Sequence, residues 1–244
     1  MTAPMPVRRV FGTSLLERES PCEGTVAFRF AKPAGFAFRP GQYVDIGLIH
    51  PPTMDTQGAT RTFSIASAPY EPDLLVATRM GRSAFKRILA QAPAGTEARL
   101  EGPSGSFTLH KNTAKPAVFL AGGIGITPFR SIIRQAAHDH LGQSLYLFYG
   151  NSRLGRAAFL PELEELATSC PQFHLVAVMA DPAGGWRGPV GRLAPALIAG
   201  HLASLQGPIY YIAGPPEMVG GVRQSLLAAG IDEDDIRAEE FGGY

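Results

Sequence analysis

"FLAGGIGITPFRSII", residues 119–133, is the stretch that decides the fold of this chain. The apolar run 117–121 predicts a buried β-strand, and the glycines that follow it predict a tight turn into a helix. We expect Thr127 to cap that helix and Pro128 to be its first residue. Glycines in such a turn let the backbone approach a pyrophosphate, whose negative charge is favoured by the dipole of the following helix.

By itself, this turn is equally compatible with an ordinary strand-to-helix connection, because Pro128 stands where the dinucleotide fingerprint has its third glycine. Two more predicted strands end in small or polar residues, in the stretches 148–152 and 210–219. Ligands of open α/β sheets gather at the carboxyl ends of parallel strands. We therefore expect the three loops to line one crevice, although Pro215 and Pro216 also fit simple helix initiation.

The rhythm of the sequence changes near residues 112–116 and indicates two domains. Before this boundary, short alternating segments separated by Gly and Pro are typical of an antiparallel β-barrel or sandwich, interrupted by one helix at 83–89 with Ser83 as its cap. After it, five apolar runs alternate with amphipathic segments, which predicts a five-stranded parallel α/β sheet covered on both faces. We expect a β-domain at 1–112 and an α/β domain at 113–244. The helices of the second domain are expected at 127–141, 157–168, 192–203 and 215–229.

Composition narrows the class of partner. The 244 residues carry a formal net charge of +1, so no overall field attracts nucleic acid or an anionic membrane. The two cysteines, Cys22 and Cys170, form neither a disulfide framework nor an iron–sulfur motif. We find no signal peptide and no transmembrane run, which favours a cytoplasmic protein. The sequence "HDH" at 138–140 indicates an exposed helix end, so no metal site is predicted.

Five motifs follow one another along the chain: RTFS (61–64), GRSAF (81–85), GGIGITP (122–128), AGPPE (213–217) and EEFGGY (239–244). Their order and approximate spacing resemble the ferredoxin–NADP reductase superfamily over nearly the whole chain. The resemblance implies an FAD-binding β-barrel followed by a nicotinamide-binding α/β domain, as in a single-flavin member without an iron–sulfur domain.

In the first domain, the resemblance assigns the FAD contacts to the RTFS strand. Arg61 would pair with the pyrophosphate, a task for which a planar guanidinium is well suited. Phe63 would lie against the flavin or its ribityl chain, and Ser64 would offer its hydroxyl to flavin N5, the atom that accepts hydride. Thr62 belongs to the same cofactor-binding strand, and we expect it and Ile65 to face the barrel core.

The helix at 83–89 would direct its N-terminus toward the same pyrophosphate, which explains why a β-domain contains one helix. The residues implied there are Gly81, Arg82 and Ser83. Many family members have Tyr where Phe63 stands, a change that keeps the stacking area and loses one hydroxyl contact.

In the second domain, the resemblance implies two groups of nicotinamide contacts. Gly123, Gly125 and Thr127, with Pro128 at the helix start, would hold the dinucleotide. Gly214, Pro215 and Pro216 would shape the nicotinamide slot. Ala213 replaces a cysteine that often precedes this Gly-Pro-Pro sequence, and we expect that change to tune geometry and rate.

The C-terminus carries three further implied residues. Glu240 matches an acidic residue that positions nicotinamide or relays a proton. Phe241 and Tyr244 resemble aromatic tails that cover the flavin, and packing at the seam between the domains is the alternative for both.

The choice between NADP and NAD rests on the end of the second parallel strand. Ser152, Arg153 and Arg156 follow that strand and could meet a 2′-phosphate, and no Asp or Glu stands there to bind a free ribose diol. The sequence therefore favours NADPH, with NAD left open.

The predicted function is an FAD-dependent oxidoreductase that takes hydride from NAD(P)H onto flavin and hands electrons onward. The acceptor would be a ferredoxin, a flavodoxin or an oxygenase component. One alternative is a flavin or ferric reductase without a protein partner. Another is an electron-transfer or regulatory subunit that binds flavin without nicotinamide turnover, against which the intact GGIGITP motif argues.

Overall fold

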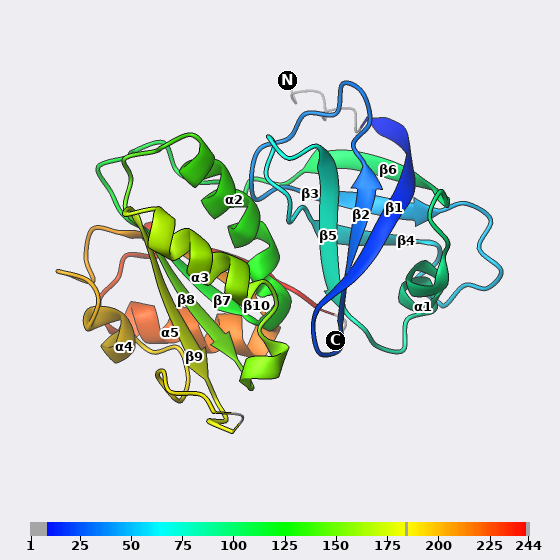
Figure 1. Cartoon of the computed structure of the whole chain (residues 1–244). Coiled ribbons are helices and arrows are strands. Elements are labelled where there is room, and N and C mark those ends of the chain that lie inside the picture. The colour runs from blue at the N-terminus through cyan, green and yellow to red at the C-terminus, as the bar shows by residue number, and fades with distance from the viewer. Residues whose placement is uncertain (1–8, 184, 243–244) are drawn as a thin grey trace, which may run out of the picture.

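The computed structural model describes residues 9–183 and 185–242, and in this part of the chain two sheets lie side by side (Figure 1). The N-terminal sheet is antiparallel, with the strand order β4-β3-β6-β1-β2-β5. Its strands are β1 (Val10–Cys22), β2 (Thr25–Ala31), β3 (Tyr43–Leu48), β4 (Thr60–Ser64), β5 (Asp73–Arg79) and β6 (Glu97–Ser104). One helix, α1 (Ala84–Gln91), follows β5.

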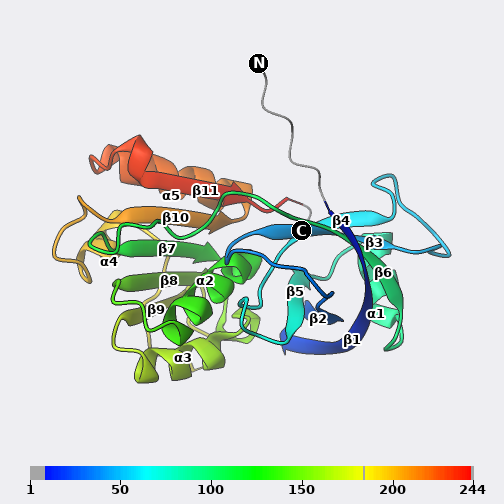
Figure 2. The ribbon, with the colours of Figure 1, turned by 90° about the horizontal axis from the view of Figure 1, so that it is seen from above.

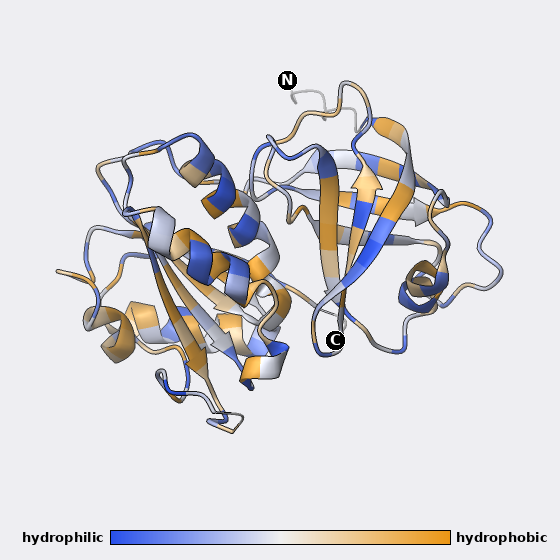
Figure 3. Ribbon diagram, in the orientation of Figure 1, coloured by the Kyte–Doolittle hydropathy of each residue, from blue (hydrophilic) through white to orange (hydrophobic). Residues whose placement is uncertain are grey.

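The N-terminal sheet curls around one apolar core because its strands alternate inward and outward residues. Phe28, Phe30 and Ile46 are fully buried in that core, and Phe85 and Leu89 of α1 close one end of it. The hydropathy colouring shows the same alternation of orange and blue along these strands (Figure 3).

The C-terminal sheet is parallel throughout, with the strand order β11-β10-β7-β8-β9. Its strands are β7 (Ala117–Gly122), β8 (Leu145–Asn151), β9 (Phe173–Met179), β10 (Ile209–Gly214) and β11 (Ile236–Glu240). Its helices are α2 (Ile126–His138), α3 (Leu160–Ser169), α4 (Pro195–Ala199) and α5 (Pro216–Ala228), and the short 3₁₀ turns are η1 (Gly123–Gly125), η2 (Leu154–Arg156) and η3 (Glu233–Asp235). The predicted architecture, an antiparallel barrel-like sheet with one helix and then a five-stranded parallel α/β sheet, is confirmed.

Both faces of the parallel sheet are covered, as the near-continuous apolar strands predict. On β7, Phe119 packs with α2 and α3 on one face, while Val118 and Leu120 pack with α4 and α5 on the other. Seen from above, α5 lies on one side of the sheet and α2 and α3 lie on the opposite side (Figure 2). None of the helices in the described ranges combines the length and the apolar character needed to cross a bilayer.

The start of α2 differs from the prediction. The helix begins at Ile126, with Gly125 as its N-cap, so Thr127 and Pro128 already lie inside the first turn. The reason is that η1 runs directly into the helix, and the Thr127 hydroxyl donates to the Ile124 carbonyl at 3.1 Å. The helix after β9 is also much shorter than the expected 192–203, since α4 is a single turn.

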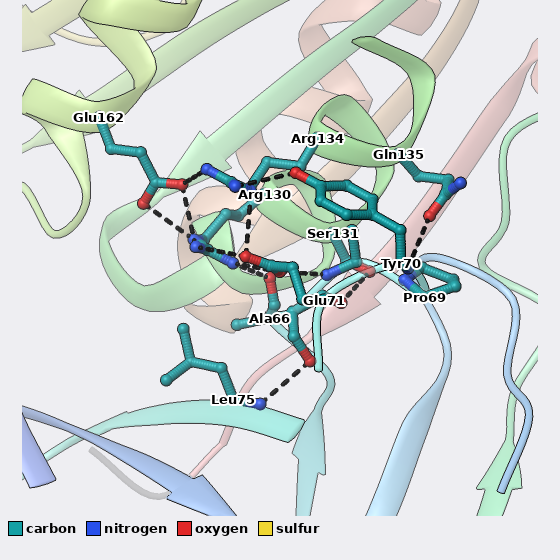
Figure 4. Close-up of polar contacts among 12 residues, drawn as sticks. Ala66, Pro69, Tyr70, Glu71, Leu75, Arg130, Ser131, Arg134, Gln135 and Glu162 are labelled. Carbon is teal, nitrogen blue, oxygen red and sulfur yellow. Dashed lines mark hydrogen bonds and ion pairs between the residues drawn. The ribbon is translucent and has the colours of Figure 1, made fainter. Parts of the chain in front are cut away.

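A buried ionic cluster joins the two sheets (Figure 4). Arg130 of α2 is 5% exposed, and it donates to the Ala66 carbonyl at 2.6 Å and to the two Glu71 oxygens at 3.2 and 3.3 Å. Its Nε donates to Glu162 of α3 at 3.0 Å. Arg134, one turn further along α2, also pairs with both carboxylates. The connection between β4 and β5 is thereby fixed to two helices of the other domain.

Two further contacts between the domains lie along α2, and together with the ionic cluster they form the seam between the two sheets. The Ser131 hydroxyl donates to the Ser67 carbonyl at 2.7 Å, and the rings of Tyr70 and His138 stack with their centroids 4.1 Å apart. The predicted boundary near 112–116 falls in the segment between β6 and β7, and the exact division at residue 112 stays a prediction.

Candidate functional site

A cavity of about 610 Å³ lies where the two sheets meet, and both of them contribute to its wall. β3, β4, β5 and α1 line it from one side, and η1, the first turn of α2 and the end of β11 line it from the other. The lining residues are Tyr43, Gln57, Arg61, Thr62, Phe63, Ser64, Ala77, Thr78, Ser83, Lys86, Ile124, Thr127, Glu239, Glu240, Phe241 and Gly242.

Many of the residues predicted from the sequence meet in this wall although they lie far apart in the chain. They are Arg61, Thr62, Phe63, Ser64, Ser83, Thr127, Glu240 and Phe241. Gly81 and Arg82 are exposed immediately before α1, and Pro128 is buried inside α2. Tyr244 lies outside the described residues.

In the RTFS strand, the side chain of Thr62 points away from the barrel core, which is the opposite of what we expected. Thr62 is exposed and its hydroxyl donates to Asp45, whereas Phe63 is 7% exposed and packs in the barrel core against Phe85, with ring centroids 5.9 Å apart. The alternation of the strand requires this, because Phe63 and the fully buried Ile65 must share a face. The expectation that Thr62 faces the core is therefore wrong, and that for Ile65 is confirmed.

Arg61 has its guanidinium engaged within the chain. Nη1 donates to the carbonyls of Gln57, Gly58 and Thr60 at 3.1, 2.9 and 2.7 Å. Nη2 forms an ion pair with Asp55, and this contact lowers the pKa of the Asp55 carboxyl to about 2. Asp55 was not anticipated from the sequence, because nothing in the loop 50–58 marks it as a partner of Arg61.

The N-terminus of α1 is capped by the same carboxylate. Asp55 accepts from the backbone N–H of Ala84 at 2.9 Å and from the Ser83 hydroxyl at 3.2 Å. Ser83 occupies the predicted N-cap position, but its side chain bonds to Asp55 and not to its own helix. Helix α1, Ser83 and Arg61 are therefore arranged around one negatively charged group.

The glycine-rich turn is shaped by the packing of two strand ends. A Cβ on Gly125 would lie 2.1 Å from the Ala213 carbonyl oxygen, so only glycine fits where η1 passes the end of β10. Gly214 has φ +156°, and a Cβ there would come within 3.1 Å of Gly122. The turns after β7 and β10 are thus in direct contact, as expected for the ends of neighbouring parallel strands.

Two adjacent carboxylates reach the cavity from the end of β11. Glu240 is exposed, whereas Glu239 is partly buried, and this burial raises its pKa to about 7. Phe241 follows them, and its N–H donates to the Gly214 carbonyl at 2.9 Å. Glu239 was missed in the sequence, where two consecutive glutamates offered no way to choose between them.

Lys86 is a second lining residue that the sequence did not indicate. It lies one turn after Ser83 on α1, and its Nζ donates to the Arg79 carbonyl at 3.0 Å. Burial lowers its pKa, and the nearby charge of Arg61 adds to that effect. The helical spacing of Ser83 and Lys86 is the signal that could have identified it.

Arg153, the residue expected to meet a 2′-phosphate, pairs with Glu23 of the β1–β2 turn. Both side chains are more than half exposed, so this pair is weak and easily exchanged for another anion. The Asp55 and Arg61 side chains, at 26% and 12% exposure, form a much more sheltered pair.

Comparison with known proteins gives three findings. A model of the oxidoreductase NAD-binding domain family matches residues 119–224. The reductase component of propane 2-monooxygenase from Mycolicibacterium goodii is 28% identical over 238 residues, which cover 94% of this chain and 67% of that protein. Reductase component 2 of terephthalate 1,2-dioxygenase from Comamonas sp. is 29% identical over 211 residues, which cover 84% of this chain and 59% of that protein.

The solved structure of a ferredoxin–NADP⁺ reductase from Neisseria gonorrhoeae, with bound FAD and NADP, superposes with a TM-score of 0.79 at 22% identity and covers 95% of this chain and 98% of that one. The chain therefore has the fold of the ferredoxin–NADP reductases, and its residues 119–224 match the NAD-binding domain family of the oxidoreductases. The chain spans about three fifths to two thirds of the length of the curated relatives that it matches.

The residues around the cavity fit a flavin. The volume of about 610 Å³ lies within the range of roughly 300–1,000 Å³ that is usual for cofactor sites. Phe63, Ala77 and Ile124 provide apolar walls for a ring, and cationic Lys86 lines the cavity on the side of α1. Hydroxyl groups that can orient a ligand come from six of the lining residues, Tyr43, Thr62, Ser64, Thr78, Ser83 and Thr127.

Proposed function

We propose that this chain takes hydride from NADPH onto one bound FAD and passes the electrons to a redox protein. The observation that carries the proposal is the cavity itself, because Ser64 of β4, Thr127 of α2 and Glu239 of β11 all line one space. A flavin held by the N-terminal sheet and a nicotinamide held by the C-terminal sheet could meet only at such a shared wall. Bound FAD would supply the change from a two-electron donor to single-electron transfer.

The roles of the chain's own residues follow from their positions. Phe63 and Ile124 would exclude water from opposite sides of the cavity, and the hydroxyl of Ser64, which also lines it, would hydrogen-bond the reactive edge of the ring. Glu239 holds a proton near neutral pH because burial raises the pKa of its carboxyl to about 7. It is therefore a stronger candidate than Glu240 for orienting a nicotinamide amide or relaying a proton.

The remaining predicted residues stay part of this proposal. Gly123, Gly125, Thr127 and Pro128 would hold the dinucleotide at the start of α2, and Gly214, Pro215 and Pro216 would border the nicotinamide. Ser152 and Arg153 are exposed after β8, where a 2′-phosphate could replace Glu23 as the partner of Arg153. This exchange is the reason that we favour NADPH over NADH.

The acceptor is proposed to be a protein such as an oxygenase component, a ferredoxin or a flavodoxin. Support comes from the relatives, whose names describe reductase components of a monooxygenase and a dioxygenase. Met54 and Leu154 are large apolar residues exposed on the surface, and an acceptor protein could cover them.

A visible spectrum of the purified protein, recorded before and after NADPH addition under argon, tests the central proposal. We expect one FAD per chain and bleaching of its absorption band by NADPH. A colourless protein that takes up no FAD would contradict it. Turnover with free flavin or ferric chelate, combined with inactivity toward all three protein acceptors, would remove the protein partner from the proposal and leave the hydride transfer intact.

A further inference from the structure

Asp55 is the inward-pointing residue of an otherwise exposed loop. Residues 52–54, 56 and 57 are exposed, and Met54 is 66% exposed. Asp55 is partly buried, and its backbone closes a tight turn in which the Gly58 N–H donates to the Asp55 carbonyl at 2.9 Å. The turn therefore presents one carboxylate to the rest of the molecule as a compact unit.

The Asp55 carboxylate accepts hydrogen bonds from four donors. It accepts from the Gln57 N–H at 3.1 Å, the Ala84 N–H at 2.9 Å, the Ser83 hydroxyl at 3.2 Å and the Arg61 guanidinium. The last three lie outside the turn. A backbone N–H at a helix N-terminus, a hydroxyl and a guanidinium together form the donor set that binds a phosphate group.

The position of this group relates it to the cavity. Arg61, Ser83 and Gln57 line the cavity wall, and Lys86 stands one helical turn beyond Ser83. A phosphate bound there would therefore lie at the end of the same space that fits the ring. The phosphate would compete with the negatively charged Asp55 for Arg61 and for the N-terminus of α1.

We propose that Asp55 is an internal competitor of the flavin phosphates, and that flavin binding displaces the turn 55–58 from Arg61 and α1. The inference rests on the proposed function, since it concerns the same site. The carboxylate keeps the guanidinium and the helix end satisfied until a phosphate takes them over. The exposed loop allows this exchange, because its other side chains leave little apolar surface buried.

The opposite role for Asp55 is that of a positioning residue that holds Arg61 and α1 ready for the phosphates. The two roles predict changes of opposite sign. If Asp55 competes, its neutral variant binds FAD more tightly. If Asp55 positions the donors, the same variant binds FAD more weakly.

The test is Asp55→Asn in protein stripped of flavin, titrated with FAD and with riboflavin by fluorescence. We expect FAD to bind to the variant at least about tenfold more tightly than to the wild type, because the variant lacks the charge that competes with the phosphates for hydrogen bonds. Riboflavin, which has no phosphate, should bind to both proteins with the same affinity. Asp73→Asn is the matched control, because it removes the same charge from the start of β5, a strand whose other end carries the lining residues Ala77 and Thr78. Weaker or unchanged FAD binding by Asp55→Asn would overturn the proposal.

Hydrogen exchange on the wild type provides a second test that needs no variant. Adding FAD should increase exchange at the amides of Gln57 and Gly58, because the turn that contains them would lose the bonds from Arg61 to its Gln57 and Gly58 carbonyls and would open more often. Greater protection of these amides would overturn displacement. If FAD binds to neither the wild type nor Asp55→Asn, the proposed function fails together with this inference, whereas FAD binding without these effects refutes the inference alone.

Discussion

The seam between the two sheets yields the sharpest quantitative prediction. Arg130→Met keeps a long apolar side chain in α2 but removes four hydrogen bonds, one to Ala66, two to Glu71 and one to Glu162. Breaking a buried ion pair by removing one partner costs roughly 3–5 kcal/mol, because the other charge stays desolvated. Arg134 still faces both carboxylates, so we expect the lower end, a loss of about 3 kcal/mol in the free energy of unfolding.

Urea denaturation of Arg130→Met, Glu71→Gln and the double variant measures this loss and its coupling. The two residues contact each other directly, so the double variant should lose clearly less than the sum of the single variants. Arg99→Met serves as the control, because Arg99 pairs with Glu101 at 3.1 Å while 59% exposed and should contribute less than about 1 kcal/mol.

The seam also has a functional consequence. Ala66 lies two residues after Ser64 on the barrel side, and Arg130 lies three residues after Thr127 on α2, so the cluster controls how far apart two walls of the cavity stand. We expect Arg130→Met to lower the limiting rate of flavin reduction by about tenfold or more with little change in FAD affinity, since misplacement of about 1 Å can cost roughly 10²-fold. A loss below about 1 kcal/mol together with a wild-type reduction rate would refute the reasoning.

Three further predictions concern the cavity and the nucleotide. Ser64→Ala should leave FAD bound and slow its reduction by NADPH in anaerobic stopped-flow measurements, because in the proposed site the lost hydroxyl would contact the reactive edge of the flavin and not the phosphates. An unchanged limiting rate would contradict this role of Ser64. Arg153→Ala should raise KM for NADPH and leave KM for NADH nearly unchanged, and equal effects on both would contradict a 2′-phosphate contact. Glu239→Gln should change how the stability of the protein depends on pH. Burial raises the pKa of Glu239 from its ordinary value of 4.5 to about 7, so between these values the folded protein holds a proton that the unfolded chain has lost. The wild type therefore loses stability as the pH rises through this range. Melting temperatures at pH 4 and pH 8 should therefore favour the glutamine variant only at the higher pH, and a constant difference would refute the shift.

The sequence by itself determined the architecture and half of the residues that line the cavity. The change from alternating segments to continuous apolar runs separates an antiparallel sheet from a parallel one, because the two sheets expose different numbers of faces to water. The RTFS strand, Ser83 and Thr127 were predicted to belong to one site because their motifs resemble those of the ferredoxin–NADP reductases, and they line one cavity in the structure.

Only the tertiary structure decided which groups these residues meet. Asp55 lies in a loop without any local signal, and it reaches Arg61 and α1 because the chain folds back after β3. Arg130 and Glu71 are 59 residues apart, and each alone resembles an ordinary surface charge until packing buries both. Glu239 and Glu240 are identical in type, and only the orientation of β11 decides that Glu239 is partly buried, which raises its pKa, while Glu240 is exposed. Contacts between distant segments depend on how elements pack, and packing is a property of the whole fold that local residue patterns do not encode.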